Sequence, residues 1–74
     1  MNQLTTEEVA TPIARWRTRM GISQRAAAKA LGLSLPGYQE IERGASFRDG
    51  RPRDADLRTR LACAALEQGI APIA

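Results

Sequence analysis

Arginine supplies almost all of the positive charge in this chain of 74 residues. Eleven basic residues, all arginine except Lys29, stand against eight acidic ones, which gives a net charge of +3 and a pI of about 10.0. Five of the arginines fall in the stretch FRDGRPRDADLRTR, residues 47–60. The planar guanidinium group forms paired hydrogen bonds with phosphates and with base edges. The pattern therefore indicates an anionic partner such as nucleic acid, although +3 alone is equally typical of an arginine-rich solvated surface.

The residue types that carry most enzymatic and metal chemistry are scarce. The chain has no histidine, the commonest general base, and a single cysteine, Cys63. A zinc site would have to combine one thiolate with carboxylates, and an intrachain disulfide is impossible. We therefore expect no enzyme activity, no cofactor, no metal and no small-molecule ligand. No apolar run approaches the roughly 20 residues of a membrane helix, so we expect a protein of the reducing cytoplasm without membrane contact.

Capping residues and apolar spacing predict an all-α fold of four to five helices in one domain, residues 1–74. Each expected helix follows a Ser, Thr or Asp cap and ends near a glycine. The expected helices cover residues 12–20, 24–31, 35–43 and 54–69. Either Asp54 or Asp56 caps the last helix, and an earlier turn over residues 5–10 would add a fifth.

The second and third helices are separated only by Gly32, Leu33 and Ser34. Such a short turn with a glycine is typical of a helix-turn-helix. We predict this motif over residues 22–44, followed by a basic loop over residues 45–53. The inward-facing residues are expected to include Ile13, Trp16, Met20, Tyr38 and Ile41, and the second helix is expected to pack through Ala26, Ala27, Ala28 and Ala30.

Residues 21–44 resemble the lambda-repressor/Cro-like helix-turn-helix, often called the xenobiotic-response-element family. The resemblance is carried by Gly21-Ile22-Ser23-Gln24, Ala28, Leu31-Gly32, Ser34, Tyr38, Ile41 and Glu42-Arg43-Gly44. It runs from Ile13 to Gly44 and less sharply to Gln68. It implies a lambda-repressor-like fold and a transcriptional regulator that binds double-stranded DNA. The expected protein is a homodimeric repressor of the phage or mobile-element type, without a separate ligand-binding domain, on a palindromic operator.

The resemblance also implies roles for particular residues. Positions that contact the DNA backbone in relatives are occupied here by Ser23, Gln24, Arg25, Ser34, Arg43, Arg48, Arg51 and Arg53. Arg17 and Glu42 match a structural pair that ties the first helix to the recognition helix. For Arg43 and the loop arginines, a solvated surface position is the alternative.

The recognition helix begins unusually, with Leu35, Pro36 and Gly37, where relatives carry polar residues that read bases. One interpretation is that Leu35 and Pro36 make apolar contacts to bases and Gly37 lets the backbone approach. Hydrogen bonds to bases would then come from Gln39 and Glu40, with Gln suited to adenine and Glu to cytosine. The alternative is that the domain reads DNA weakly and acts as a protein-interaction module, such as an antitoxin or a bridging coactivator.

The last expected helix and the residues after it are more apolar than a closing helix requires. In the family this helix often supplies the dimer contact, so Leu61, Leu66, Ile70 and Ile73 are candidates for it. The alternative is that Leu61, Leu66 and Ile70 complete the core of the monomer.

Overall fold

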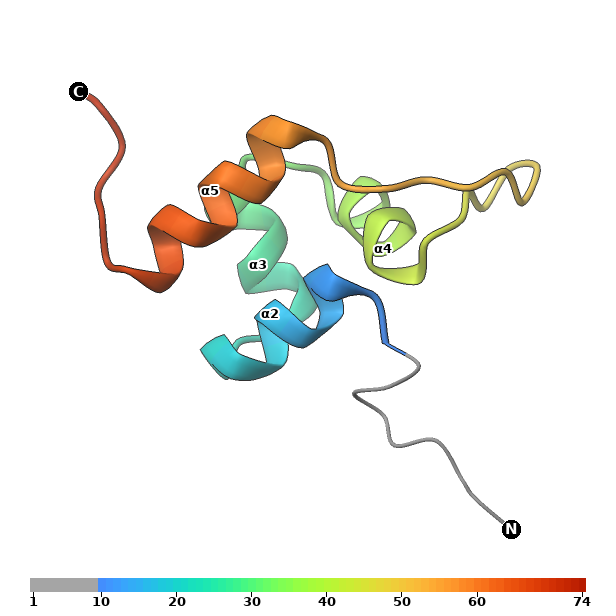
Figure 1. The fold of residues 1–74 in the computed structure, drawn as a ribbon. Coiled ribbons are helices and arrows are strands. Elements are labelled where there is room, and N and C mark those ends of the chain that lie inside the picture. Colours follow the sequence, from blue (N-terminus) through green and yellow to red (C-terminus); the bar gives the residue numbers. More distant parts are fainter. Residues whose placement is uncertain (1–9) are drawn as a thin grey trace, which may run out of the picture.

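The computed structural model describes residues 10–74, which fold into four helices (Figure 1). The helices are α2 (Pro12–Met20), α3 (Gln24–Leu31), α4 (Leu35–Arg43) and α5 (Leu57–Glu67). The all-α prediction is confirmed. Within these residues the only β-type pairing is an isolated antiparallel bridge between Ala45 and Pro52. The earlier turn expected over residues 5–10 lies outside the described residues, apart from Ala10.

Every helix begins at a polar cap of the predicted kind. The capping side chains are those of Thr11, Ser23, Ser34 and Asp56, and each accepts a hydrogen bond from a backbone N–H in the first turn. Glycines with positive φ follow α2, α3 and α4 directly. The last helix is capped by Asp56 rather than Asp54 and is shorter than the predicted 54–69. Its start is fixed by the bond from the Thr59 N–H to Asp56 Oδ1, which is 2.8 Å long.

The core is small, largely aliphatic and built from all four helices. Its buried residues are Ile13, Trp16, Ala27, Ala28, Tyr38, Ile41 and Cys63. The Trp16 indole N–H donates to the Cys63 carbonyl oxygen over 3.0 Å, which connects α2 to α5. The expected packing face of α3 was drawn too wide, because Ala26 and Ala30 are exposed. Of these four alanines, only the adjacent pair at 27 and 28 is buried.

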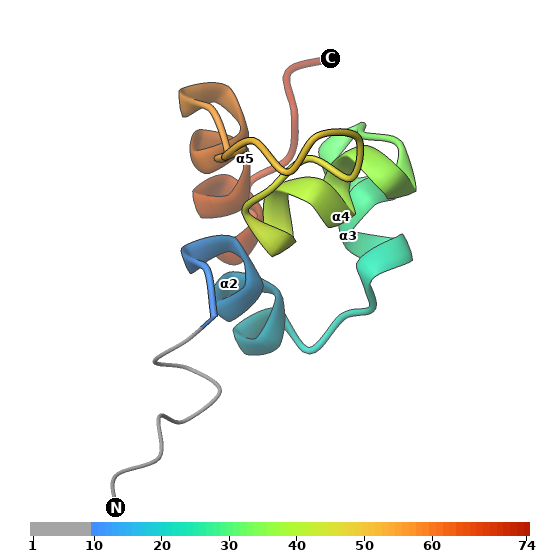
Figure 2. The same cartoon turned by 90° about the vertical axis from the view of Figure 1, so that its right-hand side faces the viewer.

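The helices are arranged so that α3 and α4 pack against each other and α2 contacts α4 (Figures 1 and 2). Helix α5 closes the other side of the core through contacts with α2 and α3. The loop between α4 and α5 and the residues after α5 project at opposite ends of the molecule (Figure 1). Within residues 10–74, none of the helices has the length and hydrophobicity that crossing a bilayer requires. Three elements position the candidate site: the start of α3, the start of α4 and the loop between α4 and α5.

Candidate nucleic-acid interface

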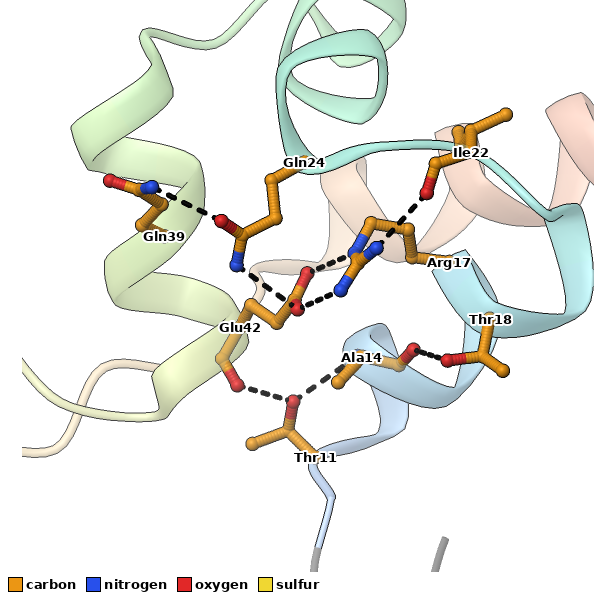
Figure 3. Close-up of polar contacts among 8 residues, drawn as sticks. All are labelled: Thr11, Ala14, Arg17, Thr18, Ile22, Gln24, Gln39 and Glu42. Carbon is orange, nitrogen blue, oxygen red and sulfur yellow. Dashed lines mark hydrogen bonds and ion pairs between the residues drawn. The ribbon is translucent and has the colours of Figure 1, made fainter. Parts of the chain in front are cut away.

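The guanidinium group of Arg17 on α2 and the carboxylate of Glu42 on α4 form a two-point ion pair (Figure 3). Arg17 Nε donates to Glu42 Oε2 over 2.8 Å, and Arg17 Nη2 donates to Oε1 over 2.7 Å. Arg17 Nη1 also donates to the Ile22 carbonyl oxygen over 3.0 Å. The two side chains are only 25% and 10% exposed. The pair therefore fixes the end of α4 to α2 and to the segment that leads into α3.

The charges of this pair support each other. Burial acts to raise the pKa of the Glu42 carboxyl group, but the hydrogen bonds from Arg17, the nearby Tyr38 hydroxyl and the hydrogen bond from Gln24 outweigh it and hold that pKa below its ordinary value. The hydrogen bond to Glu42 in turn raises the pKa of Arg17. The pair is therefore fully charged near neutral pH.

Stability is expected to be constant around neutral pH and to fall in acid. Four carboxylates, those of Glu40, Glu42, Asp56 and Glu67, have pKa values below their ordinary ones in the folded protein. Such a group stabilises the fold above its unfolded pKa, about 4 for Asp and Glu, and the stabilisation is lost as the pH falls through the lower folded value. Thermal unfolding followed by circular dichroism between pH 8 and pH 2 tests this. A midpoint that does not change below pH 4 contradicts it.

Gln24, the first residue of α3, connects the ion pair to Gln39 on α4 (Figure 3). Its Nε2 donates to Glu42 Oε1 over 3.3 Å, and its Oε1 accepts from Gln39 Nε2 over 3.1 Å. We call the connected side chains of Arg17, Glu42, Gln24 and Gln39 the polar relay. It joins three helices, and its last member is a residue that the sequence marked as a base-contact candidate.

The backbone of Glu42 is held as well as its carboxylate. Thr11 Oγ1 donates to the Glu42 carbonyl oxygen over 2.7 Å, while the same hydroxyl oxygen caps α2 by accepting from the Ala14 N–H (Figure 3). One threonine thus sets the start of α2 against the end of α4. An open hollow of about 390 Å³ lies beside it, lined in part by Gln24, Gln39 and Arg43.

The Ser34 cap explains the glycine in the unusual Leu35-Pro36-Gly37 start of α4. The Gly37 N–H donates to the Ser34 cap oxygen over 3.1 Å, and a Cβ at residue 37 would lie 2.9 Å from that oxygen. Glycine therefore leaves room for the cap. Leu35 is half-buried and packs in part against the core, whereas Pro36 is exposed, so the apolar base contacts expected of these two residues stay a prediction.

Glu40, the other predicted hydrogen-bonding base contact, is bound to the loop. Its Oε2 accepts a hydrogen bond from the Phe47 N–H over 2.7 Å, and its Oε1 lies 3.4 Å from Arg53 Nη1. The hydrogen bond from Phe47 is the main reason why the Glu40 pKa is lowered. The Glu40 side chain is 16% exposed and secures the loop to α4, so a base contact by Glu40 would require it to leave Phe47 and Arg53.

The basic loop is closed by backbone hydrogen bonds. The Ser46 N–H donates to the Arg51 carbonyl oxygen over 2.9 Å, and the Arg53 N–H donates to the Gly44 carbonyl oxygen over 3.0 Å. A turn at Gly50 with positive φ completes this shape. Figure 1 shows the loop projecting beyond α4. The backbone conformation at the loop arginines is therefore fixed by these hydrogen bonds.

The arginines around this loop are exposed and differ in their neighbours. Arg48 and Arg51 are exposed, and Arg51 lies 3.6 Å from Asp49 in a solvent-facing ion pair. Arg53 is 47% exposed beside Glu40. Arg43 stacks over the Phe47 ring at 5.1 Å from its centroid, a contact that the sequence reasoning missed. Residues four apart face each other on a helix, so the spacing of Arg43 and Phe47 could have suggested the contact. The spacing alone was not sufficient, because α4 ends at Arg43 and Phe47 lies in the loop.

The remaining backbone-contact candidates lie at the two helix starts. Ser23 and Arg25 at the start of α3 and Ser34 at the start of α4 are exposed, and both serines are occupied as caps. Unpaired backbone N–H groups and the positive end of the helix dipole make such starts suitable for phosphate. Gln24 is brought close to Gln39 by the polar relay, whereas the loop arginines lie at the other end of α4.

The dimer candidates divide into exposed and packed residues. Leu61, Ile70 and Ile73 are 61%, 60% and 100% exposed, while Leu66 is half-buried against the core. Completion of the monomer core therefore explains Leu66 but not Leu61 or Ile70. Leu57, one turn before Leu61, is also 61% exposed and was not a candidate, although the spacing of four already placed it on that face.

Comparison with known proteins places this arrangement in a family. A family model described as helix-turn-helix matches residues 13–50, from α2 through α4 into the basic loop. Searches of curated proteins and of solved structures gave no match. The matched segment covers half of the chain and contains the whole polar relay. The chain belongs to the lambda-repressor/Cro-like helix-turn-helix family of DNA-binding regulators.

Proposed function

We propose that the protein binds double-stranded DNA sequence-specifically, as a homodimeric repressor of the phage or mobile-element type on a palindromic operator. The observation that carries the proposal is the polar relay, because it holds Gln39 in place beside the open hollow rather than leaving it loose in solvent. A side chain held by a second layer of hydrogen bonds is typical of a recognition contact.

Helix α4 is proposed to lie in the major groove, which is about 12 Å wide and accepts one helix. The start of α3 would then approach a phosphate with its free N–H groups, and Gln24 and Arg25 would lie beside it. Arg48, Arg51 and Arg53 would contact the backbone on the other side of α4. Contacts of this kind position the protein and carry no sequence information of their own.

A second copy of the chain is proposed to cover the exposed apolar residues of α5. Leu57 and Leu61 lie one turn apart on that helix and are each 61% exposed, and Ile70 follows its end. Such an apolar surface in a small domain marks an interaction site. A two-fold dimer would place two recognition helices about 34 Å apart, which is one turn of DNA.

Replacing Leu61 with glutamate is expected to convert the dimer to a monomer, because two buried like charges would face each other across the two-fold axis. Sedimentation velocity at micromolar concentration measures the change, with an expected weakening of association of at least tenfold. Ala30→Glu is the matched control, since it adds the same charge at an exposed position of α3. A wild-type protein that stays monomeric, or a dimer unaffected by Leu61→Glu, contradicts the proposal.

Selection from a pool of random DNA duplexes tests the function as a whole. The expected result is enrichment of a palindrome whose half-sites are about 10 base pairs apart. Failure to enrich any sequence would favour the alternative, a protein-interaction module that uses the same exposed residues of α5. The two outcomes require no knowledge of the natural operator.

A further inference from the structure

We propose that the Arg17–Glu42 ion pair determines which base Gln39 accepts, and that this base is adenine. Neither member of the pair is the group that meets the base. They act through Gln24 as positioning residues. The inference rests on the proposed function, because it requires Gln39 to lie in the major groove.

The first step concerns the amide of Gln24. Arg17 carries only donors, and the ionised Glu42 carboxylate carries only acceptors. Because Oε1 of Glu42 lies 3.3 Å from the Gln24 amide, that amide must present its NH₂ group there. The reverse orientation would set the amide oxygen against a carboxylate oxygen. The ion pair holds Glu42 charged and in position, so it also fixes the orientation of Gln24.

The second step carries this orientation to α4. With its NH₂ group on Glu42, Gln24 turns its oxygen toward Gln39, 3.1 Å away. Gln39 must therefore donate one N–H to that oxygen. One N–H and the whole carbonyl oxygen of Gln39 remain for an outside partner. The orientation of an amide is usually ambiguous, but here it follows from the donor-only and acceptor-only ends of the polar relay.

The third step matches these free groups to a base. An acceptor beside a donor is the complement of adenine, which offers the N6 amino group and the N7 acceptor in the major groove. Guanine offers two acceptors, O6 and N7, so the Gln39 oxygen would meet O6. We expect a preference for adenine over guanine of about 10- to 100-fold at the position facing Gln39.

Among the base-contact candidates of α4, Gln39 is the one suited to a hydrogen bond with a base. Glu40 holds the loop through Phe47 and Arg53, and Leu35 packs against the core. Pro36 is exposed but has no donor or acceptor in its side chain. Gln39 is thus the amide of α4 that combines a fixed orientation with access to the hollow.

The decisive variant is Glu42→Gln, tested by selection from random duplexes and by competition between sites that differ at one position. The new amide has the shape of the carboxylate but can face Gln24 with either its oxygen or its NH₂ group. The orientation of Gln39 is then no longer imposed. The preference for adenine over guanine is expected to fall to within about threefold at that position, while preferences at other positions persist.

A second variant keeps the test independent of folding. Gln24→Ala leaves the Arg17–Glu42 pair in place and removes only the link to Gln39, so the same loss of discrimination is expected. Arg53→Gln is the matched control, because it lowers affinity for all sequences and should leave the adenine preference intact. Circular dichroism at the assay temperature verifies that each variant is folded.

The outcomes separate the inference from the proposed function. If the wild type selects a site and Gln39→Ala, Glu42→Gln and Gln24→Ala all leave its base preferences unchanged, the inference is wrong and the function stands. The same holds if Gln39→Ala changes a position at which the wild type prefers a base other than adenine. If the wild type selects no sequence, both are wrong. Loss of the adenine preference in all three variants, with the control unaffected, supports the inference.

Discussion

Replacing Arg17 with alanine is expected to destabilise the domain by about 3 kcal/mol and to abolish DNA binding at 37 °C. The substitution leaves Glu42, whose side chain is 10% exposed, without its guanidinium partner. It also removes the bond to the Ile22 carbonyl oxygen. A domain of this size has a total stability of about 4–11 kcal/mol, so such a loss is a large fraction of it. Urea unfolding followed by the fluorescence of Trp16 measures the change.

Arg19→Ala is the matched control for this prediction. Arg19 lies on the same helix and forms a similar two-point pair with Glu67, but the side chains are 54% and 34% exposed. Exposed ion pairs contribute about 0–1 kcal/mol. Equal losses for Arg17→Ala and Arg19→Ala would show that the Arg17–Glu42 pair has no special structural role.

Replacing Tyr38 with alanine is expected to cost about 3–5 kcal/mol, enough to leave much of the protein unfolded at 25 °C. Tyr38 is fully buried at the centre of the core, where α4 meets the other helices. Tyr38→Ala therefore leaves a cavity that this small core cannot close. Thermal and urea unfolding report the loss.

Tyr38→Phe separates the ring from the hydroxyl group. Burial is the main cause of the raised pKa of Tyr38, and the neighbouring Glu42 carboxylate adds to it, but among residues 10–74 the hydroxyl oxygen has no partner of hydrogen-bond geometry. Removing an unpaired buried hydroxyl is expected to change stability by less than about 1 kcal/mol, in either direction. A loss of 2 kcal/mol or more, as an order of magnitude for a broken buried bond, would show that the hydroxyl is paired in solution.

The helices and most of their ends could be predicted because their signals are local. Ser23 and Ser34 cap the helices expected from them, and the glycines at 21, 32 and 44 adopt the expected positive φ. Tyr38 is buried as its spacing on the helix predicts. The exact start of α5 was less certain, since Asp54 and Asp56 are both good caps and only the Thr59 N–H distinguishes them.

The direction of the polar side chains could not be predicted in the same way. Glu40 and Gln39 are neighbours on α4, yet one faces Phe47 in the loop and the other faces Gln24 on α3. The difference depends on where segments distant in sequence lie, and helical spacing contains no such information. For the same reason the sequence did not show that Leu35, expected at a base, is half-buried and packs in part against the core.

Fluorescence anisotropy of the purified protein tests the central claim most directly. The labelled DNA is the segment upstream of the protein's own gene, compared with a scrambled duplex of equal length across a salt series. We predict tight binding to the upstream DNA alone, with a steep loss of affinity as salt rises because phosphate contacts release counterions. Equal and weak binding to both duplexes would contradict sequence-specific recognition by α4.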